Sequence, residues 1–407
     1  MSAVAPTDGG VPPTMATVVE PTAEARPAAT ERAHGGFDWP LLGFAAALAA
    51  LGLLMILSAS SLDADMVYGN AMHFVTRQVI GLGVGSLLAA VVLSLPWTWL
   101  RRSVWVAYGA SVLSLALVMS PLGHSAKGAA RWIKLGPINV QPSEFAKVAL
   151  VLILSHYLAN NRGRLKDIVG VGLPGIALLA PLVILIIFQK DFGTTVILLG
   201  LAGVLFFIAG LQWRYIAGGI TGAFGLLAAL VLAEPYRMTR LTSFTDPFAD
   251  PDGAGYQVVQ GWIALASGGW FGTGLATGVA QRGFLPEAHT DFISAVIGEE
   301  LGALGWMFTI VLILGLVWRG FVVAGRARDL FGMLVATGIT TMFAAQAIIN
   351  MGVVCGLVPP KGLVLPFLSY GASAVLVHSL CVGILLRVSL ESGREEVAAG
   401  ASDATGG

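Results

Sequence analysis

The chain has 407 residues, of which 56% are hydrophobic and only 11% charged, and its formal net charge is zero. Soluble globular domains carry about a quarter charged residues, so this composition excludes an ordinary soluble protein. Zero net charge gives no electrostatic basis for binding nucleic acid. The two cysteines, Cys355 and Cys381, lie in apolar segments and can build neither a disulfide framework nor a metal site.

The first residues are rich in Ala, Pro, Thr and Gly, which predicts a disordered tail over 1–37. We expect a transmembrane domain over 38–390 and a second disordered tail over 391–407. Within the domain, about ten apolar runs can cross roughly 30 Å of hydrocarbon. They lie near 40–60, 74–95, 103–121, 143–159, 169–188, 192–210, 214–233, 292–318, 330–355 and 366–388. The predicted fold class is an all-α polytopic membrane protein with about ten transmembrane helices.

Lysines and arginines in the short connections predict the orientation. With a cytoplasmic N-terminus, the cytoplasmic side receives Arg101, Arg102, Arg162, Arg164, Lys166, Arg214, Arg319, Arg326, Arg328, Arg387 and Arg394. Both termini are then cytoplasmic, and the longest connection, 234–291, is an extracytoplasmic loop between the seventh and eighth helices. Other cations fall outside: Lys127, Arg131, Lys134, Arg237, Arg240, Arg282 and Lys361. These cations are either random departures from the preference of Lys and Arg for cytoplasmic loops, or they indicate that an anion is bound on the outer face.

Part of the external loop, 255–286, is apolar but interrupted by many glycines. It is too broken for a spanning helix and too apolar for a solvated loop. We therefore expect a short interfacial or re-entrant element over the helix bundle. The spacings Gly81–Gly85 and Gly218–Gly222 favour close helix packing.

Asp291 stands where the external loop turns into a long apolar helix. One interpretation is structural: Thr290 or Asp291 occupies the N-cap and satisfies free backbone N–H groups. The other is a general base at the outer membrane surface, beside Glu287 and His289. The two conflict, because a helix N-terminus stabilises the carboxylate and weakens it as a base.

Glu144 and Lys147 are three residues apart and so share one helical face. A lone charge in a membrane costs about 3 kcal/mol or more, so both are expected to face the bundle interior. They either fix helix packing as an ion pair or form the charged wall of a substrate cavity. Upstream, a cationic and aromatic loop suited to phosphate and sugar carries Lys127, Arg131, Trp132 and Lys134.

Other polar groups have structural interpretations. Asp191 and Gly193 fit a tight turn between two helices, and Glu299 and Glu300 fit a buried network. Prolines within 350–373 predict kinked helices and a cavity that opens outward. The absence of P-loop, HExxH and GxSxG motifs argues against an ATP-driven pump or a metalloprotease.

Five separated motifs occur in one order: ARWIKLGPINVQPSEFAK (130–147), QKDFGTT (189–195), GYQ (255–257), LPEAHTDFISAVIGEELG (285–302) and PPKGLVLPFLSYGAS (359–373). Together they resemble the SEDS family of bacterial shape, elongation, division and sporulation proteins, over about residues 40–390. The chain is most similar to the family's cell-division members. Lys190, Ala372 and Ala374 depart from the family motifs.

The resemblance implies an inverting peptidoglycan glycosyltransferase that polymerises lipid II on the outer face of the bacterial cytoplasmic membrane, at the division septum. It implies an FtsI-like class B penicillin-binding protein transpeptidase and other divisome proteins as partners. It implies no certain cofactor, with a divalent cation (Mg or Mn) as an option. The catalytic positions fall on Asp291, Glu144 and Lys147. Substrate contacts are expected from Lys127, Arg131, Trp132, Gln141, Ser143, Arg237, Arg240, Gln257, His289, Thr290, Lys361 and Ser369.

Two other classes of function remain open. A lipid II flippase or transporter is compatible with many kinked helices and an intramembrane Glu144–Lys147 pair. Transport predicts that this pair matters most and that Asp291 is replaceable, whereas synthesis predicts the reverse. A scaffold for division proteins would depend on no single charged residue.

Overall fold

The computed structural model describes residues 36–121, 123–126, 129–135, 138–232, 238, 244–251, 253, 255–278, 284–360 and 362–405. These residues belong to one compact unit, 35–407. All but the last two residues of the predicted tail at 1–37 therefore lie outside the described part of the chain.

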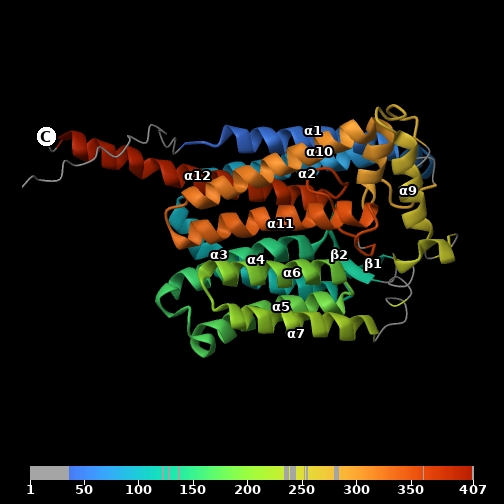
Figure 1. Cartoon of the computed structure of the whole chain (residues 1–407). Helices are drawn as coiled ribbons and strands as arrows, with labels where there is room; N and C mark the ends of the chain where they lie inside the picture. The colour runs from blue at the N-terminus through green and yellow to red at the C-terminus, as the bar shows by residue number, and fades with distance from the viewer. Residues whose placement is uncertain are drawn as a thin grey trace, which may run out of the picture. The chain divides into compact units, whose positions relative to one another are not determined.

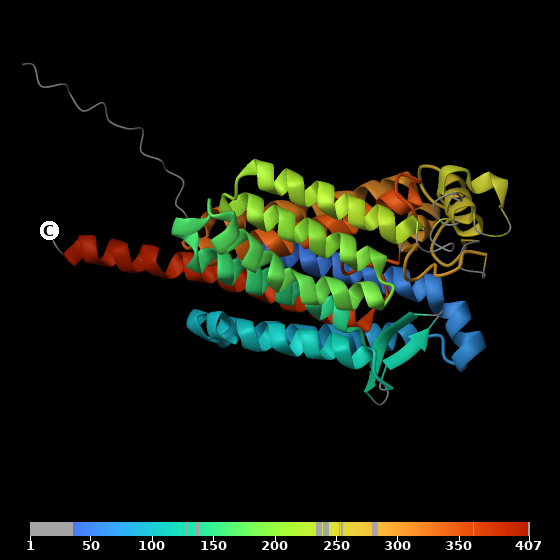
Figure 2. The same ribbon diagram turned by 90° about the horizontal axis from the view of Figure 1, so that it is seen from below.

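Long helices run side by side through this unit (Figures 1 and 2). They are α1 (Trp39–Tyr68), α2 (His73–Ser94), α3 (Trp97–Val118), α4 (Pro142–Asn160), α5 (Leu173–Phe188), α6 (Phe192–Ala209), α7 (Trp213–Leu232), α10 (Ile293–Arg326), α11 (Leu330–Val354) and α12 (Ala372–Thr405). The predicted apolar runs coincide with these helices, except that residues 366–371 of the last run are not helical and α12 begins at Ala372. Among the described residues, 8 helices are long and apolar enough to cross a membrane. The other two, α3 and α4, carry charged side chains that lower their hydropathy. The chain is a polytopic helical membrane protein.

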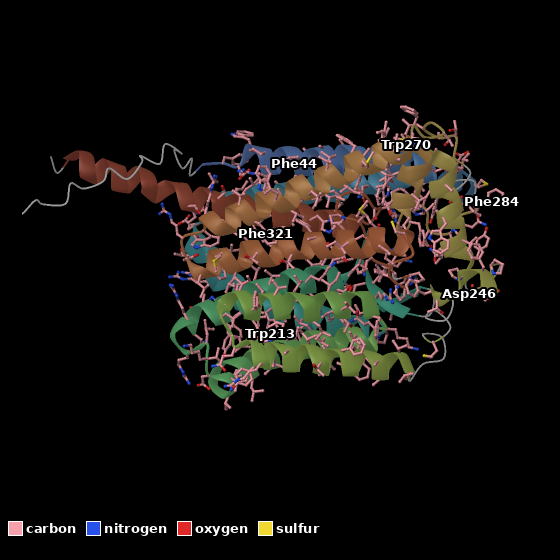
Figure 3. The ribbon with its side chains drawn as sticks, in the orientation of Figure 1. Phe44, Trp213, Asp246, Trp270, Phe284 and Phe321 are labelled. Atoms are coloured by element: carbon pink, nitrogen blue, oxygen red, sulfur yellow. The ribbon has the colours of Figure 1, made fainter. Side chains whose placement is uncertain are left out.

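The outer surface of the bundle is apolar, as contact with lipid requires. Phe224 on α7 and Leu314 on α10 are exposed, although both are large apolar side chains. Exposed tryptophans also occur at the helix ends: Trp213 begins α7, and Trp270 lies near the opposite end of the bundle (Figure 3). Aromatic side chains at both ends are typical of the two membrane–water interfaces.

The two ends of the bundle differ (Figure 1). One end, which we call the tail end, contains the start of α1 and the part of α12 around Ser389. There the Ser389 hydroxyl donates to the Gly36 carbonyl (2.9 Å). Arg319 of α10 also pairs with Asp38 there, at 2.6 Å. The opposite end, which we call the loop end, carries a small β-sheet and a short helix, α9 (Tyr256–Gly268). Short turns are η1 (Arg162–Arg164), η2 (Ile168–Gly172) and η3 (Pro247–Ala249).

The last helix is longer than expected. We predicted a disordered tail over 391–407, whereas α12 continues to Thr405. Arg387 and Glu391, one helical turn apart, form an ion pair of 3.1 Å across the predicted boundary. Such an i,i+4 pair supports helix in both directions from its position.

The expected cationic loop after α3 contains β-structure. Strands β1 (Gly123–Ala126), β2 (Ala129–Leu135) and β3 (Ile138–Val140) form an antiparallel sheet in the order β1-β2-β3. Trp132 is opposite His124, and Ile133 is opposite both Gly123 and Val140. The fold is therefore helical with one small sheet, and β2 carries Trp132 and Ile133, residue types that favour strands.

The apolar, glycine-rich part of the predicted loop 234–291 forms α9, which crosses the bundle at the loop end (Figure 1). Its Gly261 lies against Phe292: a Cβ at position 261 would be 2.9 Å from that ring. The expectation of a short element lying over the bundle is confirmed.

Glycines allow α2 to pack closely against α12. A Cβ at Gly81 would lie 2.8 Å from the Ala372 carbonyl, and one at Gly85 would lie 2.8 Å from the backbone of Leu376. The predicted packing role of the first glycine pair is confirmed. Gly218 and Gly222 have open space around them in the described structure, so that pair does not pack there.

We predict that Gly85→Leu lowers the Tm of the purified protein in detergent, because the new side chain meets the α12 backbone. Overpacking of this kind costs about 1–3 kcal/mol. The control is Gly83→Leu on the same helix, where a Cβ meets nothing within 4 Å. Equal Tm values for the two variants would contradict the packing argument.

Candidate functional site

Asp291 lies half-buried in the turn that leads into α10, at the loop end. The N-cap of α10 is Phe292, whose side chain makes no capping hydrogen bond. The expectation that Thr290 or Asp291 occupies the N-cap is therefore wrong. The preceding turn closes with the Phe292 N–H donated to the Glu287 carbonyl (3.3 Å), which delays the first helical residue to Ile293. The carboxylate thus belongs to a turn just outside the helix.

A buried amide, Asn350 in the last turns of α11, holds the backbone of Asp291. Its Nδ2 donates to the carbonyls of Asp291 (3.0 Å) and Leu363 (2.7 Å). Its Oδ1 accepts from the Ser294 hydroxyl of α10 at 3.3 Å. One side chain therefore joins α10, α11 and the segment before α12, and fixes the position of Asp291 among them.

The Asp291 carboxylate lies against the 362–371 segment. A Cβ at Gly362 would be 3.1 Å from Asp291 Oδ2, which is tighter than ordinary contact. A glycine at this position therefore lets the backbone approach the carboxylate. The neighbouring cation predicted to bind substrate, Lys361, lies outside the described residues.

Gln78 of α2 anchors the other end of the 362–371 segment. It is 1% exposed. Its Nε2 donates to the Ser369 carbonyl (3.2 Å), and its Oε1 accepts from the Gly371 N–H (3.0 Å). The Ser369 hydroxyl, which we predicted to bind substrate, is buried and accepts the Leu365 N–H at 2.8 Å. In this structure Ser369 holds the turn of the segment.

Aromatic side chains surround His289, two residues before Asp291. Its ring centroid lies 4.6 Å from that of Phe74 and 5.7 Å from that of Tyr370. Its carbonyl accepts the Tyr370 N–H (2.8 Å). Burial raises the pKa of Tyr370, and the hydrogen-bonded guanidinium of Arg77 opposes that rise. Arg77 is a cation of the loop end that was not among the predicted site residues. The sequence feature that could have identified it is a charged residue inside the apolar run 74–95.

Glu144 and Lys147 form the predicted ion pair in α4, with Nζ 2.8 Å from Oε1. Their side chains are 5% and 0% exposed, so the pair is inside the bundle as expected. Glu144 Oε2 has no hydrogen-bond partner among the described residues. The pair lies within one helix, α4, and one carboxylate oxygen of Glu144 remains available as an acceptor.

The start of α4 is tied to the start of α12. Gln141, the N-cap of α4, donates its N–H to the Ser373 hydroxyl (3.1 Å), and Ser373 donates to the Asn139 carbonyl (3.2 Å). Gln141 Nε2 also donates to the Ser143 hydroxyl at 3.1 Å. Both predicted binding residues of this motif therefore lie where β3, α4 and α12 meet.

The sheet is linked to the turn between α5 and α6. Arg131 Nη2 donates to the Lys190 carbonyl at 2.6 Å, and Trp132 beside it on β2 is half-buried. Asp191 caps α6 by accepting from the N–H (3.2 Å) and the hydroxyl (2.9 Å) of Thr194. The interpretation of Asp191 as part of a tight turn is confirmed.

The remaining predicted binding residues divide into two groups. Gln257 of α9 donates to the Pro286 carbonyl (3.1 Å), and Thr290 bonds Glu287 through its hydroxyl (2.9 Å). Both brace the turn that holds Asp291. Three predicted binding residues, Lys127, Arg237 and Arg240, lie outside the described residues, as does the external cation Arg282.

The structure brings the predicted residues to two neighbouring places. Asp291, His289, Thr290 and Gln257 surround the entry to α10, while Gln141, Ser143, Glu144 and Lys147 surround the entry to α4. The 362–371 segment and the first residues of α12 contact both groups. They form the candidate site at the loop end.

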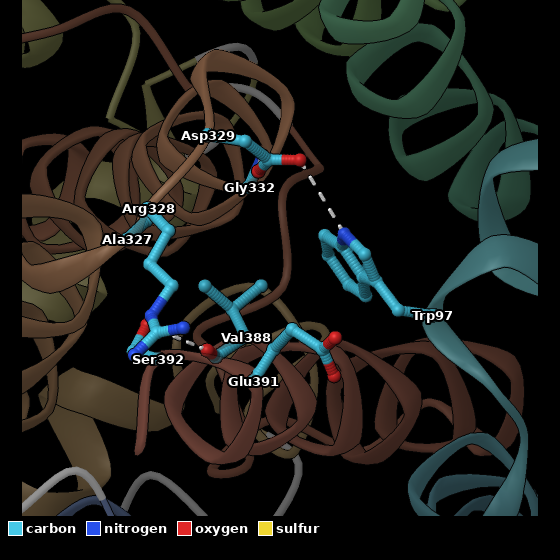
Figure 4. Close-up of a pocket in the computed structure, with 8 residues that line it drawn as sticks. All are labelled: Trp97, Ala327, Arg328, Asp329, Gly332, Val388, Glu391 and Ser392. Atoms are coloured by element: carbon cyan, nitrogen blue, oxygen red, sulfur yellow. Dashed lines mark hydrogen bonds between the residues drawn. The ribbon is translucent and has the colours of Figure 1, made fainter. Parts of the chain in front are cut away.

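Two cavities lie away from this site. One of about 270 Å³ is at the tail end, lined by Trp97, Asp329 and Glu391 among others (Figure 4). The other, of about 240 Å³, is lined mainly by apolar residues of α9 and α10, such as Leu265 and Trp306. No group of three or more His, Cys, Asp or Glu in the described part of the chain could hold a metal ion.

Comparison with known proteins decides the family. Residues 39–394 match the FtsW/RodA/SpoVE family model, which is described as a cell cycle protein. The chain belongs to this family. The resemblance inferred from the five motifs is thus confirmed.

The curated relatives include proteins named probable peptidoglycan glycosyltransferase FtsW. The one from Hahella chejuensis is 40% identical over 359 residues, which cover 87% of this chain and 90% of that protein. The one from Geobacter sp. (strain M18) is 39% identical and covers 87% and 97% respectively.

Two solved structures are similar. A chain from a peptidoglycan synthase complex, described as coordinating polymerization and crosslinking, has a TM-score of 0.73 at 30% identity and covers 88% of this chain and 99% of that one. The rod shape determining protein RodA of Thermus thermophilus has a TM-score of 0.65 at 30% identity and covers 87% and 96%.

We predict that Lys147→Met lowers the Tm strongly, because it leaves the Glu144 carboxylate buried without its cation. Breaking a buried ion pair costs about 3–5 kcal/mol. The double variant Glu144→Gln, Lys147→Met should recover part of this loss in thermal unfolding in detergent. Arg164→Met, which breaks an exposed pair with Asp167, is the control and should leave the Tm unchanged. A double variant less stable than Lys147→Met would contradict the pairing argument.

Proposed function

We propose that this chain is a peptidoglycan glycosyltransferase that polymerises lipid II, with Asp291 as the general base. The observation that carries the proposal is the position of Asp291: a half-buried carboxylate at the loop end, outside its helix, with its backbone fixed by Asn350. The relatives named as peptidoglycan glycosyltransferases support the reaction class.

We place the loop end on the outer face of the cytoplasmic membrane and both termini in the cytoplasm. The distribution of cations supports this orientation, because the tail end carries Arg101 in the first turn of α3, Arg214 in that of α7, and Arg319 and Arg326 in the last turns of α10. Cytoplasmic ends of membrane helices are enriched in Lys and Arg. The lipid substrate would then enter from the outer leaflet, level with Asp291.

The reaction joins two lipid-linked disaccharides. The 4-hydroxyl of the acceptor sugar attacks the anomeric carbon of the donor, and its proton passes to the Asp291 carboxylate. The bond between the anomeric carbon and the lipid diphosphate breaks, its electron pair remains on the diphosphate oxygen, and the anomeric centre inverts. A base positioned for such a proton transfer contributes about 10²–10⁴-fold to the rate.

Fixed cations are needed where charge develops on the leaving diphosphate. Arg77 and Arg131 are two of the described cations at the loop end, and they lie near the two groups of site residues. Lys147, oriented by Glu144 at the entry to α4, is the third cation that we assign to this role. A divalent cation carried by the diphosphate would add to this charge.

We also propose a class B penicillin-binding protein of the FtsI type as the partner, within the divisome at the septum. Support comes from the similar chain in a synthase complex that coordinates polymerization with crosslinking. New strands made at the loop end would reach a transpeptidase on the same side of the membrane.

We predict that Asp291→Asn lowers the rate of lipid II polymerisation by about 10²–10⁴-fold, because the amide cannot accept the hydroxyl proton. The measurement is glycan strand synthesis by the purified protein with its partner, in a membrane without a gradient. Asp246→Asn, an exposed aspartate of the same external loop, is the control. Unchanged glycan strand synthesis by a well-folded Asp291→Asn protein would remove Asp291 from the mechanism, whereas the absence of any strands from the wild-type protein would favour transport.

We predict that Arg77→Gln lowers kcat by about tenfold, because a charge that stabilises the leaving diphosphate is lost. Arg102→Gln, an exposed arginine of α3 at the tail end, should keep the wild-type rate in the same assay. Wild-type kcat in Arg77→Gln would remove this residue from the reaction.

A further inference from the structure

Helix α10 is broken shortly after Asp291. Gly302 has φ 69° and ψ −171°, which is not helical, so residues 293–301 form a separate half-helix. Glu299 and Glu300 end this half-helix, and each is 1% exposed. Buried carboxylates inside a membrane protein are expensive unless they have partners, so their surroundings need an explanation.

A loop after α9 satisfies the backbone groups freed by the break. Thr273 N–H donates to the Glu299 carbonyl (2.9 Å), and Gly274 N–H donates to the Glu300 carbonyl (3.1 Å). In the other direction, Ala303 N–H donates to the Gly269 carbonyl at 2.9 Å. The half-helix and the loop 269–278 are therefore hydrogen-bonded into one unit.

Ser58 of α1 ties this unit to the helix bundle. Its hydroxyl lies 2.7 Å from Oε1 and 2.6 Å from Oε2 of Glu300, and it accepts the Ala276 N–H at 3.0 Å. Ser58 is 6% exposed. These contacts, the Ser58–Glu300 latch, connect three segments that are far apart in the sequence: α1, the loop 269–278 and the half-helix.

We infer that the Ser58–Glu300 latch is the positioning element that sets the place of Asp291 for the reaction. The inference rests on the proposed function. Asp291 stands at the start of the half-helix and Glu300 at its end, about 13 Å apart at 1.5 Å per residue. Asn350 holds the first end against α11, and the latch holds the second against α1. With both ends fixed, the half-helix cannot shift along or rotate about its axis.

A small displacement at Asp291 would be costly, because moving a catalytic group by about 1 Å can lower a rate by about 10²-fold. Among the described residues, Ser58 and Glu300 form no hydrogen bond with the candidate site residues or with the 362–371 segment. Their effect on the reaction would therefore pass through the half-helix, and would fall on kcat more than on KM.

The test measures kcat and KM for lipid II polymerisation by the full chain with its partner. Ser58→Ala and Glu300→Leu should lower kcat at least about tenfold, with KM within about twofold of wild type. Glu300→Gln keeps an oxygen that accepts from Ser58, so it should stay within about threefold of wild type. The matched control is Ser60→Ala: Ser60 is also buried on α1, but its hydroxyl donates only to the Ile56 carbonyl of its own helix.

Amide hydrogen exchange provides a readout that does not depend on activity. Exchange within 269–278 should become faster in Ser58→Ala and in Glu300→Leu, and should stay at the wild-type rate in Ser60→Ala. These amides donate into the break of α10, so they report whether the unit is still held.

Several results would overturn the inference. Faster exchange in Ser58→Ala with an unchanged kcat would show that the latch does not position Asp291. An equal loss of kcat in Ser60→Ala, or no recovery in Glu300→Gln, would point to general damage instead. If Asp291→Asn remained active, the proposed function would fail, while the exchange data would still report on the latch itself.

Discussion

Backbone amides and carbonyls inside a membrane protein must find partners within the protein, because lipid offers none. The loop end of this chain is organised by that constraint. The break at Gly302 exposes backbone groups that only another backbone can satisfy, and the loop after α9 does so over Thr273 and Gly274. The course of the loop after α9 follows from the same break, since a continuous helix would leave the N–H groups of Thr273 and Gly274 without these acceptors.

The same constraint acts on the 362–371 segment, which has no regular secondary structure. Two buried amide side chains compensate for this: Gln78 bonds Ser369 and Gly371, and Asn350 bonds Leu363. Amides suit the task, because each offers a donor and an acceptor without a charge to desolvate. Irregular backbone can thus lie beside the Asp291 carboxylate inside the protein.

Part of this arrangement could be predicted from the sequence. The helices follow from long apolar runs, and the Glu144–Lys147 pair follows from the three-residue spacing within one helix. The contacts that hold the site join residues that are far apart in the sequence. Ser58 and Glu300 are 242 residues apart, and no local pattern relates them. The strand β2 was missed because its seven residues, AARWIKL, show no strict alternation of apolar and polar side chains, which is the sequence signal for a half-buried strand.

The two halves of the candidate site differ in how they are held. On the α10 side, Asp291 is held through its main chain, because its carbonyl accepts a hydrogen bond from Asn350. On the α4 side, Lys147 is held by the opposite charge of Glu144. In the proposed reaction Asp291 changes its protonation state, whereas Lys147 keeps its charge. Holding the first residue by its main chain and the second by an ion pair fits these two proposed roles, and the segment between Gly362 and Ser373 contacts both groups of site residues.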